Sequence, residues 1–99
     1  MNCAIGGQIK DMKEIWIDVR TVEEYESGHI EGAINIPHEE IGGKIESVVK
    51  DKSQKIHLYC KGGRRAGIAK DVLEKMRYTN VINEGGYEDI KKRLEKDPN

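Results

Sequence analysis

Short runs of apolar residues separated by polar turns make up most of the chain, and their spacing alternates between two periods. Four runs rich in β-branched or aromatic residues predict strands, at residues 15–19, 33–36, 56–60 and 80–83. Between these runs, apolar residues three or four positions apart predict helices. Strands that alternate with helices are typical of an α/β domain, with a parallel sheet covered by helices on both faces.

Local signals mark where the predicted helices begin and end. Thr21 and Glu24 have the spacing of a capping box, in which each side chain accepts a hydrogen bond from the other residue's backbone amide. Gly28 is placed to end that short helix. The two longer helices carry apolar stripes, which consist of Ile41, Ile45, Val48 and Val49 in the first and Ala69, Val72, Leu73 and Met76 in the second.

The predicted organisation is one small domain. Residues 1–13 carry little pattern and are predicted to be a loosely ordered lead-in, whereas residues 14–96 hold the predicted domain. Gly85 and Gly86 are predicted to turn the chain after the last strand, ahead of a final amphipathic helix. A chain of 99 residues has room for one core of this kind.

The composition excludes several classes of protein but does not identify the function. The 17 basic and 18 acidic side chains leave a net charge of −1, which argues against a basic nucleic-acid-binding protein. No window approaches the ~20 apolar residues of a membrane span, and two cysteines are too few for a disulfide-stapled fold. We therefore expect no nucleic-acid partner and no membrane partner. We expect a cytoplasmic location as the chain stands, or a periplasmic one if a signal peptide has been removed.

The most informative position is Cys60, which ends a predicted strand and precedes a glycine-containing loop and a helix. In open parallel sheets, ligands bind beyond the carboxyl ends of the strands. The amides of residues 61–65 and the positive end of the helix dipole are placed to surround the sulfur, where both favour the thiolate. A lone cysteine is often buried and inert, but this loop favours a nucleophile. The loop residues are Lys61, Gly62, Gly63, Arg64 and Arg65.

Three separated motifs resemble those of the single-domain rhodaneses, which are thiosulfate sulfurtransferases, and among them the small phage-shock-protein E type. Residues 17–37 resemble the first family signature, residues 59–67 the active-site loop, and residues 85–87 the closing motif. The resemblance covers residues 15–90. It implies a small rhodanese-like α/β domain whose central parallel sheet of four or five strands has helices on both faces.

The resemblance implies sulfur transfer in two steps, without a cofactor. The Cys60 thiolate takes the outer sulfur of thiosulfate, becomes a persulfide, and passes the sulfur to cyanide or a thiol. Lys61, Arg64 and Arg65 would attract the dianionic donor. An alternative is a persulfide carrier or protein-interaction module, which receives sulfur from a protein donor and turns over little thiosulfate.

Other polar residues receive supporting roles. The resemblance suggests that Asp18, together with Arg20, supports the active-site loop from the neighbouring strand. Ala66 stands where many family members have serine or threonine, so we expect one hydroxyl hydrogen bond to the loop to be missing. Cys3 is a candidate resolving thiol for Cys60. The histidines and cysteines lack metal-ligand spacing, so we expect no metal site.

A cysteine phosphatase or arsenate reductase is the competing enzyme class. Cysteine phosphatases place an arginine six positions after the cysteine, whereas position 66 is alanine here and Arg65 lies at the five-residue spacing. The shorter loop suits a single sulfur atom better than a tetrahedral phosphate. A phosphatase also needs an acid to protonate its leaving group, for which Asp18 is the candidate.

Overall fold

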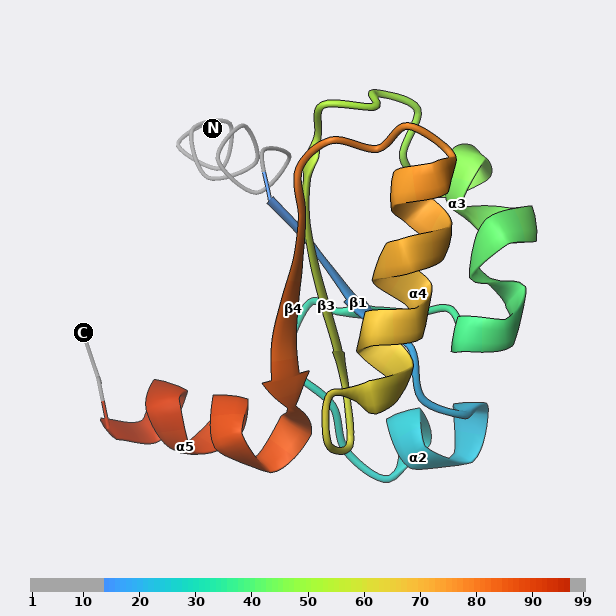
Figure 1. Cartoon of the computed structure of the whole chain (residues 1–99). Helices are drawn as coiled ribbons and strands as arrows, with labels where there is room; N and C mark the ends of the chain where they lie inside the picture. The colour runs from blue at the N-terminus through green and yellow to red at the C-terminus, as the bar shows by residue number, and fades with distance from the viewer. Residues whose placement is uncertain (1–13, 97–99) are drawn as a thin grey trace, which may run out of the picture.

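The structure is a computed structural model that describes residues 14–96 (Figure 1). The predicted lead-in 1–13, which includes Cys3, lies outside the described residues. The elements follow one another along the chain as β1 (Glu14–Asp18), α2 (Val22–Glu26), β2 (Ile34–Asn35), the 3-10 helix η1 (His38–Glu40), α3 (Ile41–Val48), β3 (Lys55–Cys60), α4 (Arg64–Lys75), β4 (Val81–Gly86) and α5 (Tyr87–Lys96). Every strand and helix predicted within this range is present.

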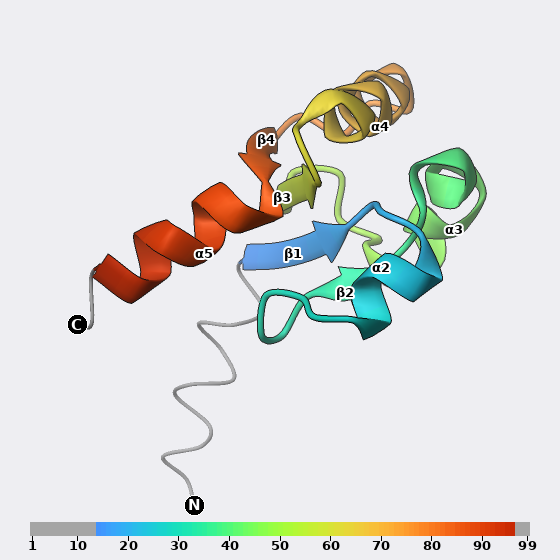
Figure 2. The same ribbon diagram turned by 90° about the horizontal axis from the view of Figure 1, so that it is seen from below.

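The four strands form one parallel sheet in the order β2-β1-β3-β4. β3 lies in the interior of the sheet and pairs with β1 from Lys55 opposite Glu14 to Tyr59 opposite Asp18. Helices α3 and α4 cover one face of the sheet and α5 covers the other, as the view from below shows (Figure 2). The predicted α/β architecture, with helices on both faces, is confirmed.

The side chains of β3 contribute to a core on each face of the sheet, because successive side chains of a strand point to opposite sides. Ile56, Leu58 and Cys60 belong to the larger core, which α3 and α4 cover. Tyr59 points the other way, into a smaller core that includes Ile90 of α5. Burial on both faces holds β3 firmly, and with it the residues at its carboxyl end.

The short helix α2 begins and ends as predicted. The Thr21 hydroxyl accepts a hydrogen bond from the Glu24 amide (3.2 Å), and the Glu24 carboxylate accepts one from the Thr21 amide (3.0 Å), which completes the capping box. Gly28 follows the helix with a φ of +142°, a conformation that favours glycine. The box holds the Glu24 carboxylate in one orientation.

One apolar position of α3 does not belong to the buried stripe. Ile41 and Ile45 are fully buried, whereas Val48 is 37% exposed and its neighbour Val49 is buried. The helix ends at Val48, and Val49 has extended backbone angles (φ −127°, ψ 104°), so helical spacing no longer applies there. The prediction that Val48 lies on the buried stripe is wrong.

The predicted turn at Gly85 and Gly86 is also wrong, because both glycines belong to β4. Gly86 pairs with Cys60 across a register shift in the β3–β4 ladder, and Gly85 has a φ of +95°. Helix α5 then begins directly at Tyr87. The irregular end of β4 therefore lies beside the residue that ends β3.

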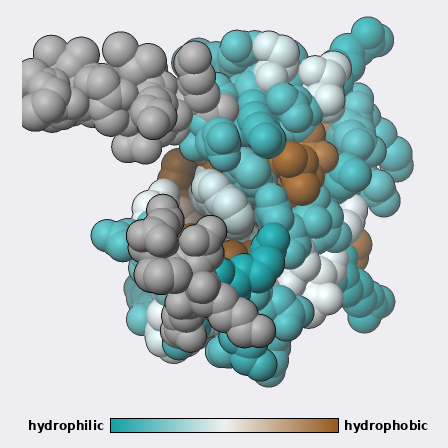
Figure 3. Space-filling model, turned by 90° about the vertical axis from the view of Figure 1, so that its left-hand side faces the viewer, coloured by the Kyte–Doolittle hydropathy of each residue, from teal (hydrophilic) through white to brown (hydrophobic). Residues whose placement is uncertain are grey.

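A polar cluster lies on the α5 side of the sheet, with the buried His57 at its centre. His57 stacks on Trp16, with ring centroids 4.4 Å apart, and its two ring nitrogens lie 2.6 Å from a Glu84 oxygen and 2.9 Å from a Glu14 oxygen. The surface on this side is mostly hydrophilic, with small apolar patches (Figure 3). Within the described residues, no helix combines the length and the apolar character that a membrane crossing requires.

Candidate active site

Cys60 is the last residue of β3 and opens the loop that leads into α4. Its Sγ accepts hydrogen bonds from the backbone amides of Gly63 (2.9 Å) and Ala66 (3.4 Å). The residue is only 1% exposed and lies at the carboxyl end of the sheet, where α/β folds bind ligands. Amide donors that face a sulfur stabilise its negatively charged form.

The sulfur takes the place of a helix cap. Gly63 is the N-cap residue of α4, with a φ of +97°, and it has no side chain that could accept a bond from the first turn. The amide of Ala66, the third residue of the helix, donates to Cys60 instead. An N-cap side chain usually accepts this bond, and a negative charge there also meets the positive end of the helix dipole. The Cys60 sulfur therefore occupies the position of an N-cap acceptor.

Only part of the predicted loop touches the sulfur. Within residues 61–65, Gly63 donates to Sγ, while the second donor, Ala66, lies outside the predicted segment. Lys61 and Arg64 are exposed, and neither forms an ion pair with another described residue. Both are therefore available to attract an anion. The exposed loop residues are Lys61, Gly62 and Arg64.

Strand β4 supports the loop from the side. Asn83 donates through Nδ2 to the Gly63 carbonyl (3.0 Å), and its Oδ1 accepts from the Gly85 amide (2.9 Å). Gly86 lies so close to the loop that a Cβ at this position would collide with the Lys61 carbonyl oxygen. Contacts with β4 therefore fix the loop backbone around the sulfur.

Arg65 faces α2, where it forms a two-pronged ion pair with Glu24. Nη1 donates to Oε1 (2.8 Å) and Nη2 donates to Oε2 (3.2 Å). The hydrogen bonds from Arg65 outweigh the opposing effect of burial and lower the pKa of Glu24 to about 2, so Glu24 is ionised at neutral pH. The Glu24 carboxylate thus neutralises the positive charge of Arg65, which the sequence predicts to attract the anionic donor.

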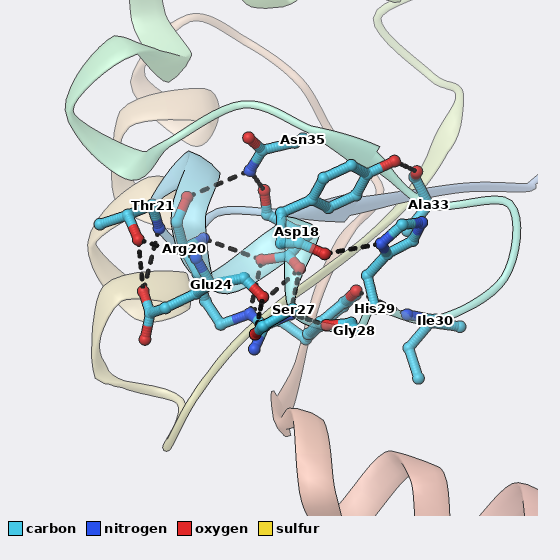
Figure 4. A network of polar contacts seen from close by, with 12 residues as sticks. Asp18, Arg20, Thr21, Glu24, Ser27, Gly28, His29, Ile30, Ala33 and Asn35 are labelled. Atoms are coloured by element: carbon cyan, nitrogen blue, oxygen red, sulfur yellow. Dashed lines mark hydrogen bonds and ion pairs between the residues drawn. The ribbon is translucent and has the colours of Figure 1, made fainter.

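Asp18 and Arg20 form a buried ion pair at the carboxyl end of β1, as Figure 4 shows. The fully buried Asp18 carboxylate accepts from the Arg20 amide (2.9 Å) and from Nη2 of its guanidinium (2.6 Å), and this bonding is the main cause of a raised Arg20 pKa. Arg20 Nη2 also donates to the Gly28 carbonyl (2.7 Å). These hydrogen bonds reach the segment after α2, and support of residues 61–65 by the pair stays a prediction.

Two tyrosines enclose the Arg20 guanidinium. Its central carbon lies 4.6 Å from the Tyr87 ring centroid and 5.7 Å from that of Tyr59. The Tyr59 hydroxyl accepts a hydrogen bond from the Ile30 amide (3.0 Å), and burial raises the pKa of this phenol above its usual value. Tyr87, which directly follows Gly86, therefore links the loop-supporting end of β4 to the buried ion pair.

Sequence reasoning misses three contributors to the site. Glu24 is identified only as a helix cap, although an acid on α2 and Arg65 in the loop are both visible in the sequence. Asn83 is identified only as part of a strand, and nothing in the sequence indicates its bridging role. The Ala66 amide has no sequence signal at all, because every residue other than proline has a backbone N–H.

The chain resembles known proteins in sequence and in fold. The chain matches the family model of the rhodanese-like domain over residues 6–93. It is 48% identical over 77 residues to the thiosulfate sulfurtransferase PspE of Escherichia coli, across 78% of this chain and 74% of that protein. A solved rhodanese with anions from E. coli has a TM-score of 0.75 at 47% identity, across 77% of this chain and 89% of that one.

The chain belongs to the rhodanese-like domain family, and the expected kinship with the small phage-shock-protein E type is confirmed. A further relative is YrkF of Bacillus subtilis, whose name describes a candidate sulfur carrier protein. It is 34% identical over 67 residues, which are 68% of this chain but only 35% of YrkF, so that likeness concerns one part of YrkF.

Replacing Gly86 by alanine should displace the active-site loop, because the new Cβ collides with loop backbone. We expect a loss of about 1–3 kcal/mol in the free energy of unfolding. We also expect shifted NMR amide signals for Gly63 and Ala66, the donors to Cys60. Gly43→Ala is the matched control, since a Cβ there meets nothing within 4 Å. Unchanged Gly63 and Ala66 signals in the Gly86 variant would contradict the proposed contact.

Replacing Asp18 by asparagine should leave the Arg20 charge buried without its partner. We expect a loss of about 3–5 kcal/mol in the free energy of unfolding, measured by denaturant titration at neutral pH. The double variant Asp18→Asn/Arg20→Met should lose less, because it buries no unpaired charge. If the double variant is as unstable as the single one, the ion pair is not the reason for the loss.

Proposed function

We propose that this protein moves the outer sulfur of thiosulfate to a thiophilic acceptor, with Cys60 as the carrier. The observation that carries the proposal is the Cys60 sulfur at the amino end of α4, where the Gly63 and Ala66 amides donate to it. Similarity to the thiosulfate sulfurtransferase PspE over most of the chain supports the same activity. A sulfur in this position is a stabilised nucleophile at the edge of the sheet where ligands bind.

In the first step, the Cys60 thiolate attacks the outer sulfur of thiosulfate. A bond forms between Sγ and that sulfur, the sulfur–sulfur bond of thiosulfate breaks, and sulfite leaves with the electron pair. No general base is needed, because the nucleophile and the leaving group are both anions. The resulting persulfide keeps a negative charge at the amino end of α4, where the helix dipole and loop amides stabilise it.

In the second step, cyanide or a thiolate attacks the outer sulfur of the persulfide. The sulfur–sulfur bond to Cys60 breaks, and its electron pair returns to Sγ. The products are thiocyanate or a new persulfide, together with the free Cys60 thiolate. Splitting the transfer into two displacements means that donor and acceptor need not occupy the site together, so ping-pong kinetics are expected.

Lys61 and Arg64 supply the positive charge that draws in the dianionic donor. Both side chains are exposed, so this attraction acts over a distance and weakens as salt is added. Arg65 contributes less than its position in the sequence predicts, because Glu24 balances its charge.

A sulfur carrier that exchanges sulfur with protein partners is the second candidate function. The similarity to YrkF favours it, as does the Glu24–Arg65 ion pair, which reduces the positive charge available to thiosulfate. In that case a persulfidated protein loads Cys60 quickly, while thiosulfate does so slowly.

A cysteine phosphatase is disfavoured by the surroundings of the acid considered for it, Asp18. Asp18 is fully buried, and both of its carboxylate oxygens accept hydrogen bonds from Arg20. A carboxylate held in this way is not available to protonate a leaving group.

Replacing Cys60 by serine should reduce thiocyanate formation from thiosulfate and cyanide to background, because the sulfur carrier is gone. The free energy of unfolding should change by less than about 1.5 kcal/mol, since serine has a similar size and keeps an acceptor near the Gly63 and Ala66 amides. Cys3→Ser, the control, should keep full activity.

Two outcomes of this assay would change the proposal. Thiocyanate formation at the original rate in the Cys60 variant would exclude Cys60 as the carrier. Negligible turnover in the original protein, combined with rapid loading of Cys60 by a persulfidated protein, would replace the enzyme by the sulfur carrier.

A further inference from the structure

We propose that Glu24 determines which sulfur donors Cys60 accepts, because it cancels the charge of Arg65 beside the thiolate. The inference rests on the proposed function and names a residue that sets the preference among its donors. Donors that carry one negative charge, such as organic thiosulfonates, gain relative to dianionic thiosulfate when Glu24 is paired with Arg65.

Glu24 is held too firmly to act as an ordinary surface acid. Its Oε1 accepts from Arg65 Nη1 (2.8 Å), from the Thr21 amide (3.0 Å) and from the Thr21 hydroxyl (3.1 Å). Its Oε2 accepts from Arg65 Nη2 (3.2 Å). Only 31% of the Glu24 side chain and 26% of the Arg65 side chain are exposed, so the pair is screened less than a fully exposed one.

The ion pair lies within electrostatic reach of the nucleophile. Arg65 is the second residue of α4, the helix whose amino end carries the Cys60 sulfur. The hydrogen bond to Glu24 is the largest cause of a raised Arg65 pKa, and an ionised Cys60 would add to it. Arg65 therefore interacts with both anions, but Glu24 holds its guanidinium directly.

The charge of the pair decides how strongly the site responds to the charge of a donor. Glu24 and Arg65 together carry no net charge. The attraction of Arg65 for an approaching anion is therefore cancelled at long range by the repulsion from Glu24. Coulomb energy is proportional to the donor charge, so an unpaired Arg65 would help a dianion twice as much as a monoanion. The ion pair thus removes an advantage that thiosulfate would otherwise have.

A thiosulfonate uses the same chemistry with a smaller charge. The Cys60 thiolate attacks its outer sulfur, a bond forms to Sγ, and the bond between that sulfur and the sulfonyl sulfur breaks. A sulfinate leaves with the electron pair, and the Cys60 persulfide is the same product that thiosulfate gives. No oxidant or reductant is required.

The test compares kcat/KM for thiosulfate with kcat/KM for methanethiosulfonate, with cyanide as acceptor. Glu24→Gln should raise the value for thiosulfate about tenfold and that for the monoanion about threefold, so that their ratio rises about threefold. Glu23→Gln is the matched control, because it removes the same charge from an exposed residue of the same helix. In this control, the ratio of kcat/KM for thiosulfate to kcat/KM for methanethiosulfonate should change by less than about 1.5-fold.

The opposite substitution separates charge from structural damage. Arg65→Gln leaves the Glu24 charge unpaired and should lower the ratio about threefold. The double variant Glu24→Gln/Arg65→Gln should return to the original ratio. A damaged loop would shift both single variants in the same direction. That result, or an unchanged ratio in Glu24→Gln, overturns the proposal.

A second measurement needs no sulfur transfer. In a Cys3→Ser background, Cys60 is alkylated with neutral iodoacetamide and with anionic iodoacetate. Glu24→Gln should raise the rate with iodoacetate relative to iodoacetamide about threefold, and Arg65→Gln should lower it. An unchanged ratio of alkylation rates overturns the role of Glu24. If the protein makes no thiocyanate but the ratio of alkylation rates changes as expected in these variants, the proposed function is contradicted and the role of Glu24 is not.

Discussion

The Cys60 sulfur accepts hydrogen bonds from the N-cap residue and the first turn of α4, and the rest of the site is arranged around this contact. Three constraints make it possible. Burial of β3 on both faces fixes the end of the strand, the positive φ of Gly63 turns the chain tightly into the helix, and the absence of a side chain at Gly86 leaves room for the loop. The result is a sulfur that serves as the helix cap, so the favourable interaction grows when it is ionised.

Two ion pairs near this end of the sheet have different physical roles. Asp18 and Arg20 are buried together and join β1 to the segment after α2, so their pairing matters chiefly to stability. Glu24 and Arg65 are partly exposed, and Arg65 belongs to the first turn of α4, so their pairing is proposed to matter chiefly to the charge that a substrate meets. Removing one partner of the Asp18–Arg20 pair should therefore chiefly lower stability, whereas removing one partner of the Glu24–Arg65 pair should chiefly change the preference among donors.

Most of the fold is predictable from the sequence, because strand and helix periodicity are local properties. The position of Cys60 at a strand end follows in the same way, and with it the place of the site. The failures arise where local pattern meets tertiary contacts. Val49 is buried and Val48 is exposed at the point where α3 ends and the chain becomes extended, and Gly86 is not in a turn because the ladder with β3 continues through it. The partner of Arg65 could not be predicted, since it lies 41 positions away on α2.

The role of Cys60 as sulfur carrier is tested most directly by the mass of the protein after incubation with thiosulfate. If Cys60 is the sulfur carrier, the peptide that contains it gains about 32 Da, one sulfur atom, and loses that mass when cyanide is added. The Cys3 peptide keeps its original mass through both steps. No gain at Cys60, or a gain that cyanide does not remove, would contradict a sulfur held at the amino end of α4 for transfer.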